Sequence, residues 1–180
     1  MNLCRIVILF CLIGLAPNIA ALQSNSSAPI TIESDRAERD ENIGVTKYLG
    51  EVIITQGDLS IRAEHVTVNY TDDRVSRILC EGSPSSFRLN SSSDEEVLGL
   101  AEAIEYVLVE ETVNLTRNAS LSRNGTIIRG DTINYDLKNG VWKARGNSQS
   151  RQKRIQLVIP ASEINDRTKS NSSNLKNTIP

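Results

Sequence analysis

A pair made of a small residue followed by an acid recurs four times along the chain, at Ser34-Asp35, Ala63-Glu64, Ala101-Glu102 and Gly130-Asp131. Successive pairs are 29, 38 and 29 residues apart. An apolar residue lies two positions before and three and five positions after most of the pairs, with Gly99 and Arg39 as the departures. A glycine or asparagine follows 15 to 18 residues after each acid, at Gly50, Gly82, Asn118 and Gly146. A period of this length is typical of repeat architectures, so we interpret the chain as one unit copied four times.

The stretches around these pairs alternate apolar and polar residues, as in Val66-Thr67-Val68 and Ile133-Asn134-Tyr135. A period of two is typical of strands that bury one face, and valine, isoleucine, threonine and tyrosine favour strands. Turn-forming pairs separate the stretches, at Asp72-Asp73, Asn124-Gly125 and Asn139-Gly140. No amphipathic helical pattern of useful length interrupts them, so we expect an all-β domain.

Side-chain parity predicts a bend at each small-acid pair. Ile61 and Val66 flank Ala63 and are five positions apart, so an unbroken strand would point them to opposite faces. A bend or a one-residue bulge returns both side chains to one face, and the acid then points to solvent. Four stacked units of this kind predict a twisted, V-shaped or roll-like sheet of short strands, with an apolar interior and two open ends.

The N-terminal segment differs in kind from the rest. Arg5 precedes an apolar run over residues 6–16, and the small residues Ala20 and Ala21 follow. This pattern is typical of a cleavable signal peptide over residues 1–21, and the run is short for a membrane span, which takes about 20 apolar residues. Cleavage after Ala20 or after Ala21 is compatible with the pattern, and an uncleaved anchor is the alternative.

The other boundaries follow from composition. We expect a flexible segment over residues 22–28, the β domain over 29–165 and a disordered polar tail over 166–180. The longer second spacing contains a polar segment over residues 90–96, which we expect to be a mobile loop. Trp142 is expected to pack in the core.

The residues that commonly carry chemistry are scarce. His65 is the single histidine, and Cys80 is the single cysteine outside the predicted signal peptide, so no disulfide can form within the exported chain. We expect His65 to be an exposed strand residue and Cys80 to be a buried, inert thiol. We therefore predict a protein that is not an enzyme, with no catalytic residue, no metal site and no cofactor. With 20 basic and 22 acidic residues spread along the chain, binding to nucleic acid is not expected.

Several segments, in this order and spacing, resemble the OstA-like repeats of the periplasmic lipopolysaccharide transport proteins of the LptA family. They are residues 30–35, 48–57, 61–68, 130–137 and 154–160, and the resemblance covers roughly residues 28 to 165. It implies a twisted β-jellyroll of repeated short antiparallel strands, open at both ends, in the periplasm. It also implies that the protein receives lipopolysaccharide from an inner-membrane export complex and passes it, through like-folded neighbours, to an outer-membrane receptor.

The resemblance implies two sets of site residues. The acyl chains of lipid A would contact the apolar residues Ile30, Ile32, Phe87, Tyr106 and Leu108, although a hydrophobic core uses the same residue types. The edges at the two ends of the sheet would pair with like-folded inner-membrane and outer-membrane transport proteins, and with further copies in a head-to-tail homo-oligomer. The predicted edge residues are Ile30, Ile32, Ile155, Leu157 and Ile159.

Four alternatives remain open at this point. One is the membrane-anchored LptC-like partner of the same pathway, which would keep the N-terminal apolar run. A second is the soluble domain of the outer-membrane receptor, for which a large barrel is expected to follow. A third is a parallel β-helix enzyme acting on polysaccharide, which needs a carboxylate cluster on one face. The fourth is a structural β-repeat protein with a fully packed inner face.

Overall fold

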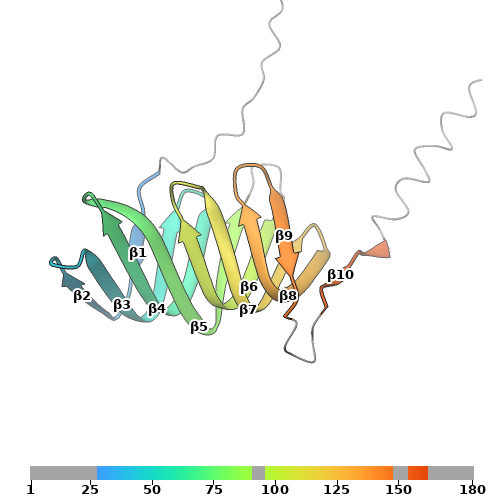
Figure 1. The fold of residues 1–180 in the computed structure, drawn as a ribbon, viewed down its shortest axis with the longest axis horizontal. Helices are drawn as coiled ribbons and strands as arrows, with labels where there is room; N and C mark the ends of the chain where they lie inside the picture. Colours follow the sequence, from blue (N-terminus) through green and yellow to red (C-terminus); the bar gives the residue numbers. More distant parts are fainter. Residues whose placement is uncertain (1–27, 91–95, 148–153, 162–180) are drawn as a thin grey trace, which may run out of the picture.

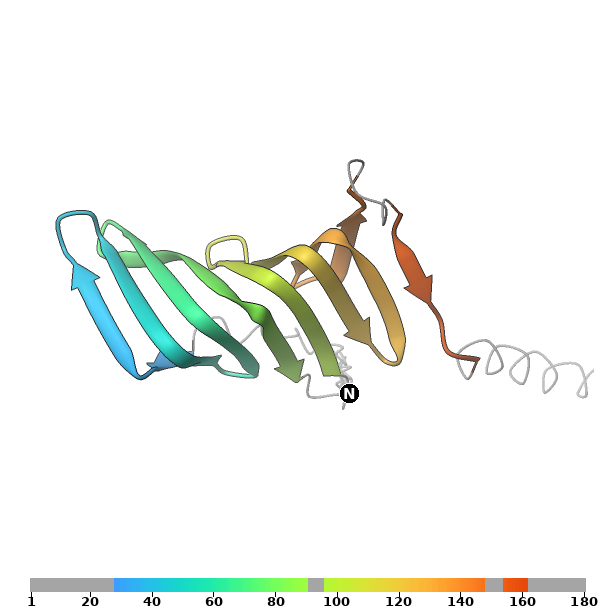
Figure 2. The same cartoon turned by 90° about the horizontal axis from the view of Figure 1, so that it is seen from below.

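The computed structural model describes residues 28–90, 96–147 and 154–161. Within these segments, ten strands form one antiparallel sheet, and Figures 1 and 2 show it as an elongated, twisted sheet whose strands run across its long axis. The strands are β1 (Thr31–Glu33), β2 (Arg36–Asp40), β3 (Val45–Gln56), β4 (Leu59–Thr71), β5 (Arg74–Asn90), β6 (Glu96–Val107), β7 (Thr112–Arg123), β8 (Thr126–Asp136), β9 (Val141–Arg145) and β10 (Gln156–Val158). The all-β fold class is confirmed, and the antiparallel pairing of every strand contradicts the parallel β-helix alternative.

The long strands β3 to β8 each cross a bend, which divides the sheet into two arms. In the first arm, β1 pairs with the second half of β3, and β10 pairs with the first half of β8. In the second arm, β2 pairs with the first half of β3, and β9 pairs with the second half of β8. No strand pairing joins β1 to β2 or β9 to β10 in the described part of the chain, so the sheet stays open along its ends.

The bend lies at the small-acid pairs. The register of neighbouring strands is interrupted at Ala63-Glu64 and again at Ala101-Glu102, and Asp131 lies between two paired residues of β8. The predicted bends are therefore confirmed. The strands are longer than expected, because the backbone keeps its strand geometry through the bend; β4 has 13 residues and β5 has 17.

Two of the strands that lie between the small-acid pairs, β3 and β7, bend at residues with left-handed backbone conformation. Gly50 has φ 82° and Asn118 has φ 53°, and both belong to the glycine and asparagine positions that follow each acid in the sequence. The Asp35 N–H donates to the Gly50 carbonyl oxygen over 3.2 Å. A Cβ at Gly50 would collide with the Asp35 carboxylate, so this bend requires a glycine on steric as well as conformational grounds.

Two acids of the small-acid pairs, Glu64 and Glu102, form hydrogen bonds with the next strand and do not only face water. The Glu102 carboxylate accepts hydrogen bonds from Asn118 Nδ2 over 2.5 Å and from Arg117 Nε over 3.3 Å. The Glu64 carboxylate accepts one from the Ser83 N–H over 3.2 Å. The expectation that the acids point simply to solvent is therefore incomplete, because each of these two carboxylates also satisfies polar groups at a neighbouring bend.

The interior lies between the two arms and is filled by the alternating apolar side chains. Those of Ile61, Val68, Ile104, Leu115 and Ile133 are each no more than 1% exposed. Side chains from both arms join one core cluster. Trp142 does not belong to it; the prediction of a core tryptophan is wrong, because this residue lies on the edge strand β9 and is 39% exposed.

Some predictions fall on residues that the structure does not describe. They concern the signal peptide over residues 1–21, most of the flexible segment over 22–28, most of the polar loop over 90–96 and the tail over 166–180.

Candidate functional site

Aromatic side chains from the two arms meet in the middle of the interior. Phe87 belongs to the first arm on β5 and is 0% exposed, whereas Tyr135 belongs to the second arm on β8 and is 2% exposed. Their rings stack with centroids 6.2 Å apart and planes inclined by 28°. This contact joins the inner faces of the two arms.

Tyr106 has a polar anchor inside the apolar interior. Its hydroxyl donates to Gln56 Oε1 over 3.0 Å, and Gln56 Nε2 donates to the Ala28 carbonyl oxygen over 3.1 Å. Burial, with a smaller contribution from the negative charge of Glu111, raises the pKa of Tyr106 above its ordinary value, which keeps the hydroxyl protonated as a donor. These bonds connect the second arm, through the end of β3, to the segment that precedes β1.

The remaining predicted lipid-contact residues lie at the rim of the interior. Ile30, Ile32 and Leu108 are half-buried and pack against the core cluster. Ile32 is paired with Ile54 of β3. All five predicted residues therefore face the interior. The sequence did not single out Gln56, because one glutamine at the end of an apolar strand carries no recognisable pattern.

The edge at the C-terminal end is apolar and exposed. Ile155, Leu157 and Ile159 are 45%, 47% and 49% exposed, and Val158 is 41% exposed. Among the residues that the structure describes, β10 pairs with β8 on one side only. Backbone groups on its other side are available to a further strand, and the apolar side chains provide area to bury. At the opposite end, β1 carries Ile32, and β3 is its one partner within residues 28–90, 96–147 and 154–161.

Few of the described residues are of the types that commonly carry out catalysis. His65 is exposed, as expected. Cys80 is 0% exposed, and burial raises its thiol pKa to about 12, so the reactive thiolate is disfavoured. In the ranges that the structure describes, no three metal-ligating side chains come together, and no helix is long and apolar enough to cross a membrane.

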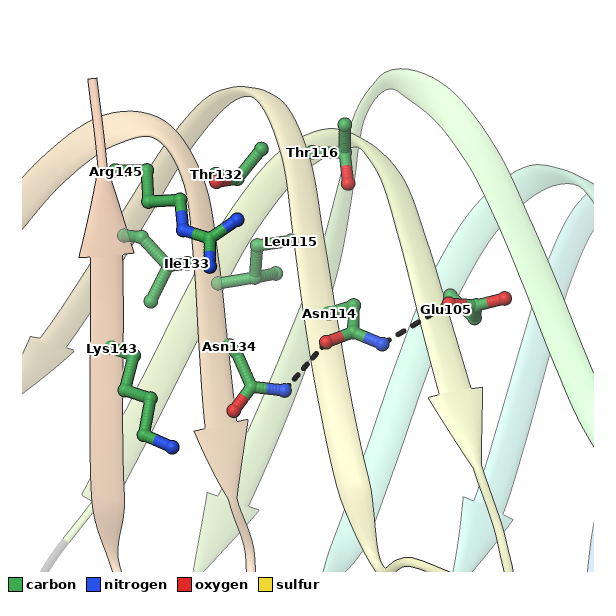
Figure 3. A pocket seen from close by; sticks show the side chains of 9 residues that line it. All are labelled: Glu105, Asn114, Leu115, Thr116, Thr132, Ile133, Asn134, Lys143 and Arg145. Atoms are coloured by element: carbon green, nitrogen blue, oxygen red, sulfur yellow. Dashed lines mark hydrogen bonds between the residues drawn. The ribbon is translucent and has the colours of Figure 1, made fainter. Parts of the chain in front are cut away.

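The outer face of the second arm carries a polar ladder that sequence reasoning missed. Arg77 NH1 donates to Glu105 over 3.1 Å. Asn114 Nδ2 donates to Glu105 over 3.1 Å, and Asn134 Nδ2 donates to Asn114 over 2.6 Å (Figure 3). Lys143 of β9 is paired with Asn134 in the sheet and extends the row. The residues alternate with interior positions, and the sequence alone suggests only that they face solvent.

A cavity of about 510 Å³ opens over this ladder. Figure 3 shows the side chains that line it, which come from β6, β7, β8 and β9. Its polar lining includes Glu105, Asn114, Thr132, Asn134, Lys143 and Arg145.

The comparisons with known proteins agree on one family. Residues 31–141 match the family described as LptA/(LptD N-terminal domain) LPS transport protein. The chain is 30% identical over 150 residues to the lipopolysaccharide export system protein LptA of Haemophilus influenzae, covering 82% of this chain and 87% of the relative. It is also 30% identical over 149 residues to LptA of Escherichia coli, covering 82% and 79%.

A solved structure resembles most of this chain. It is the crystal structure of LptH, the LptA-homologous periplasmic component of the lipopolysaccharide transport device of Pseudomonas aeruginosa. The match has a TM-score of 0.71 at 27% sequence identity and covers 76% of this chain and 99% of that chain.

Proposed function

The chain belongs to the LptA/LptD N-terminal domain family of lipopolysaccharide transport proteins, and we propose that it carries lipopolysaccharide across the periplasm with the acyl chains between the arms of its sheet. The relatives are transport components and not enzymes, which supports a role without catalytic residues, cofactors or metals. The proposal includes export to the periplasm, directed by an N-terminal signal peptide that is cleaved after Ala20 or Ala21.

The physical task is to shield acyl chains from water. Each buried methylene contributes about 0.8 kcal/mol, so an acyl chain of about a dozen carbons costs on the order of 10 kcal/mol in water. An apolar interior offsets most of this cost. Because the described sheet ends in edges with no further strand, the interior can be continuous with that of a neighbour, and the lipid need not be released into water between carriers.

The observation that carries the proposal is an apolar interior enclosed by a sheet that does not close. Phe87 and Tyr106 lie deep in it, while Ile30, Ile32 and Leu108 lie at its rim. The arms are joined along the bend and by side-chain contacts such as Phe87–Tyr135. We propose that a lipid enters by parting these contacts, so that its methylenes replace the contacts that the side chains lose.

Transfer between carriers would use the exposed strand edges. Ile155, Leu157 and Ile159 at one end and Ile30 and Ile32 at the other supply apolar side chains beside unpaired backbone groups. We propose that like-folded inner-membrane and outer-membrane transport proteins, and further copies of this chain in a head-to-tail array, pair with these edges.

Photo-crosslinking in cells tests the carrier function. A photoreactive amino acid replaces Phe87 or, separately, Tyr106, and the exposed strand residue Arg62 provides the control position. Irradiation followed by blotting for lipopolysaccharide should give an adduct at both inner positions and none at Arg62. A folded, exported protein that gives no adduct at either inner position would refute the carrier function.

A structural β-repeat protein is the second candidate, because one observation favours it. The described interior side chains are packed against one another, with Phe87, Ile61, Ile78 and Leu115 all 0% exposed. In that case the inner positions would crosslink only to the protein itself. The same irradiation experiment therefore separates the two candidates.

A further inference from the structure

The cavity on the outer face of the second arm is unlike the interior in its chemistry. Its walls present the amides of Asn114 and Asn134, the hydroxyl of Thr132 and the cations of Lys143 and Arg145. A volume of about 510 Å³ lies within the range of small-ligand sites, which is roughly 300 to 1,000 Å³. Amides and hydroxyls both donate and accept hydrogen bonds, so this lining suits a ligand that carries many hydroxyl groups.

The charges in this cavity are separated along the row of strands. Glu105 on β6 is held by Arg77 and Asn114, so its negative charge is partly compensated. Lys143 and Arg145 lie on β9, and neither forms an ion pair with a carboxylate in the described part of the chain. Strands are spaced by about 4.8 Å, so β6 and β9 are about 14 Å apart. The cationic end can therefore bind an anion without opposing Glu105 at close range.

We propose that this cavity binds a phosphorylated saccharide, with a phosphate against Lys143 and Arg145 and sugar hydroxyls on Asn134 and Thr132. Cationic side chains form short, charge-assisted hydrogen bonds with phosphate oxygens, and the arginine fork can bind two of them at once. The neutral part of the ladder then serves the uncharged hydroxyl groups.

The position of the cavity agrees with the proposed function, on which this inference rests. β9 is the last described strand of the second arm, and no described strand pairs the two arms at this end. A lipid with its acyl chains in the interior can pass its saccharide around the β9 edge to the outer face. The cavity would thus hold the polar part of the molecule whose apolar part lies inside.

The test uses the full chain as purified and the phosphorylated oligosaccharide left after the acyl chains of lipopolysaccharide are removed. Calorimetry measures its affinity for the wild type and for the Lys143→Gln, Arg145→Gln double variant. Both residues are exposed on an edge strand, so the variant should unfold at the same temperature as the wild type. Loss of the phosphate contacts should weaken binding about tenfold or more. The dephosphorylated oligosaccharide should bind equally weakly to both proteins.

The matched control is the Lys47→Gln, Arg62→Gln double variant, which removes the same charge from exposed positions outside the cavity. It should bind like the wild type, and the amide resonances that shift on binding should belong to β7, β8 and β9.

Equal weakening in both double variants, or no binding by the wild type, would overturn the inference. It would also be overturned if substituting Lys143 and Arg145 shifted resonances of residues 162–180 without saccharide, because the chain's own tail would then be the occupant. Crosslinking at Phe87 detects the acyl chains and not the saccharide. A negative result for saccharide binding at the cavity can therefore be distinguished from a negative result for the carrier function.

Discussion

The ring of Phe87 occupies the space in which a side chain at Gly99 would lie. The two residues are directly paired on β5 and β6, and a Cβ at Gly99 would collide with Cε1 and Cδ1 of the ring. The same ring also stacks with the ring of Tyr135. Gly99 departs from the apolar pattern of the third repeat because a large side chain from the neighbouring strand fills its place.

Gly99→Ala should lower the free energy of unfolding by about 1 to 3 kcal/mol, the usual cost of overpacking a well-filled core. Urea unfolding measures the change. The control is a double-mutant cycle with Phe87→Leu, because the smaller side chain leaves room for the new methyl group. If Gly99→Ala costs the same in both backgrounds, the ring is not the cause of the strain.

Tyr106→Phe should lower the free energy of unfolding by about 1 kcal/mol, because it removes the hydrogen bond to Gln56 from a buried site. Tyr48→Phe provides the control at a half-buried tyrosine, and its cost should stay below about 0.5 kcal/mol. Chemical unfolding of both variants checks the prediction, and equal costs would show that the buried bond adds nothing.

Glu102→Ala should destabilise the bend by about 1 kcal/mol, since the carboxylate accepts bonds from both Arg117 and Asn118. Glu38→Ala removes an exposed strand carboxylate and should change stability by less than about 0.5 kcal/mol. Thermal unfolding of the two variants measures the change in melting temperature of each. If Glu102 were merely solvated, the two variants would show equal changes.

The buried thiol of Cys80 should make stability fall in alkali. Its pKa is raised from 9.0 to about 12 in the folded chain, so the unfolded chain loses the proton first. The contribution is therefore complete below pH 9.0 and is lost as the pH rises from there to about 12. The loss is at most about 1.4 kcal/mol per pH unit.

Cys80→Ala removes this dependence, so the variant should be less stable than the wild type near neutral pH, and the difference should shrink in alkali. Urea unfolding from about pH 8 to 11 follows the two proteins. Raised pKa values of Tyr48 and Tyr106 act on both proteins alike. A difference that stays constant across this range would show that Cys80 does not titrate as described.

Leu157→Lys with Ile159→Lys should weaken the proposed head-to-tail association, because charged side chains on an edge strand oppose pairing with another chain. Sedimentation at increasing concentration should show a shift toward monomer relative to the wild type. Val109→Lys, at an 88% exposed turn, adds a charge away from the edge and should associate as the wild type does. Equal loss in both variants would point to general charge repulsion instead of strand pairing.

The fold was largely predictable because its main signal is local and repeated. The parity change at Ala63-Glu64 indicates a bend without reference to any other part of the chain, and the register interruption confirms it. The site was predictable only as a set of apolar positions. The hydrogen bond between Tyr106 and Gln56 joins residues 50 positions apart, and no sequence pattern indicates such a pair.

The sequence by itself determined that the chain forms bent strands with an apolar face, since alternation and the recurring small-acid pair act within single strands. Only the tertiary structure decided which side chains of neighbouring strands contact one another. Whether Phe87 fits beside Gly99, and whether Asn114 and Asn134 join Lys143 around one cavity, depends on register between strands. Register is set by the packing of the whole interior, in which each side chain is placed by neighbours distant in sequence.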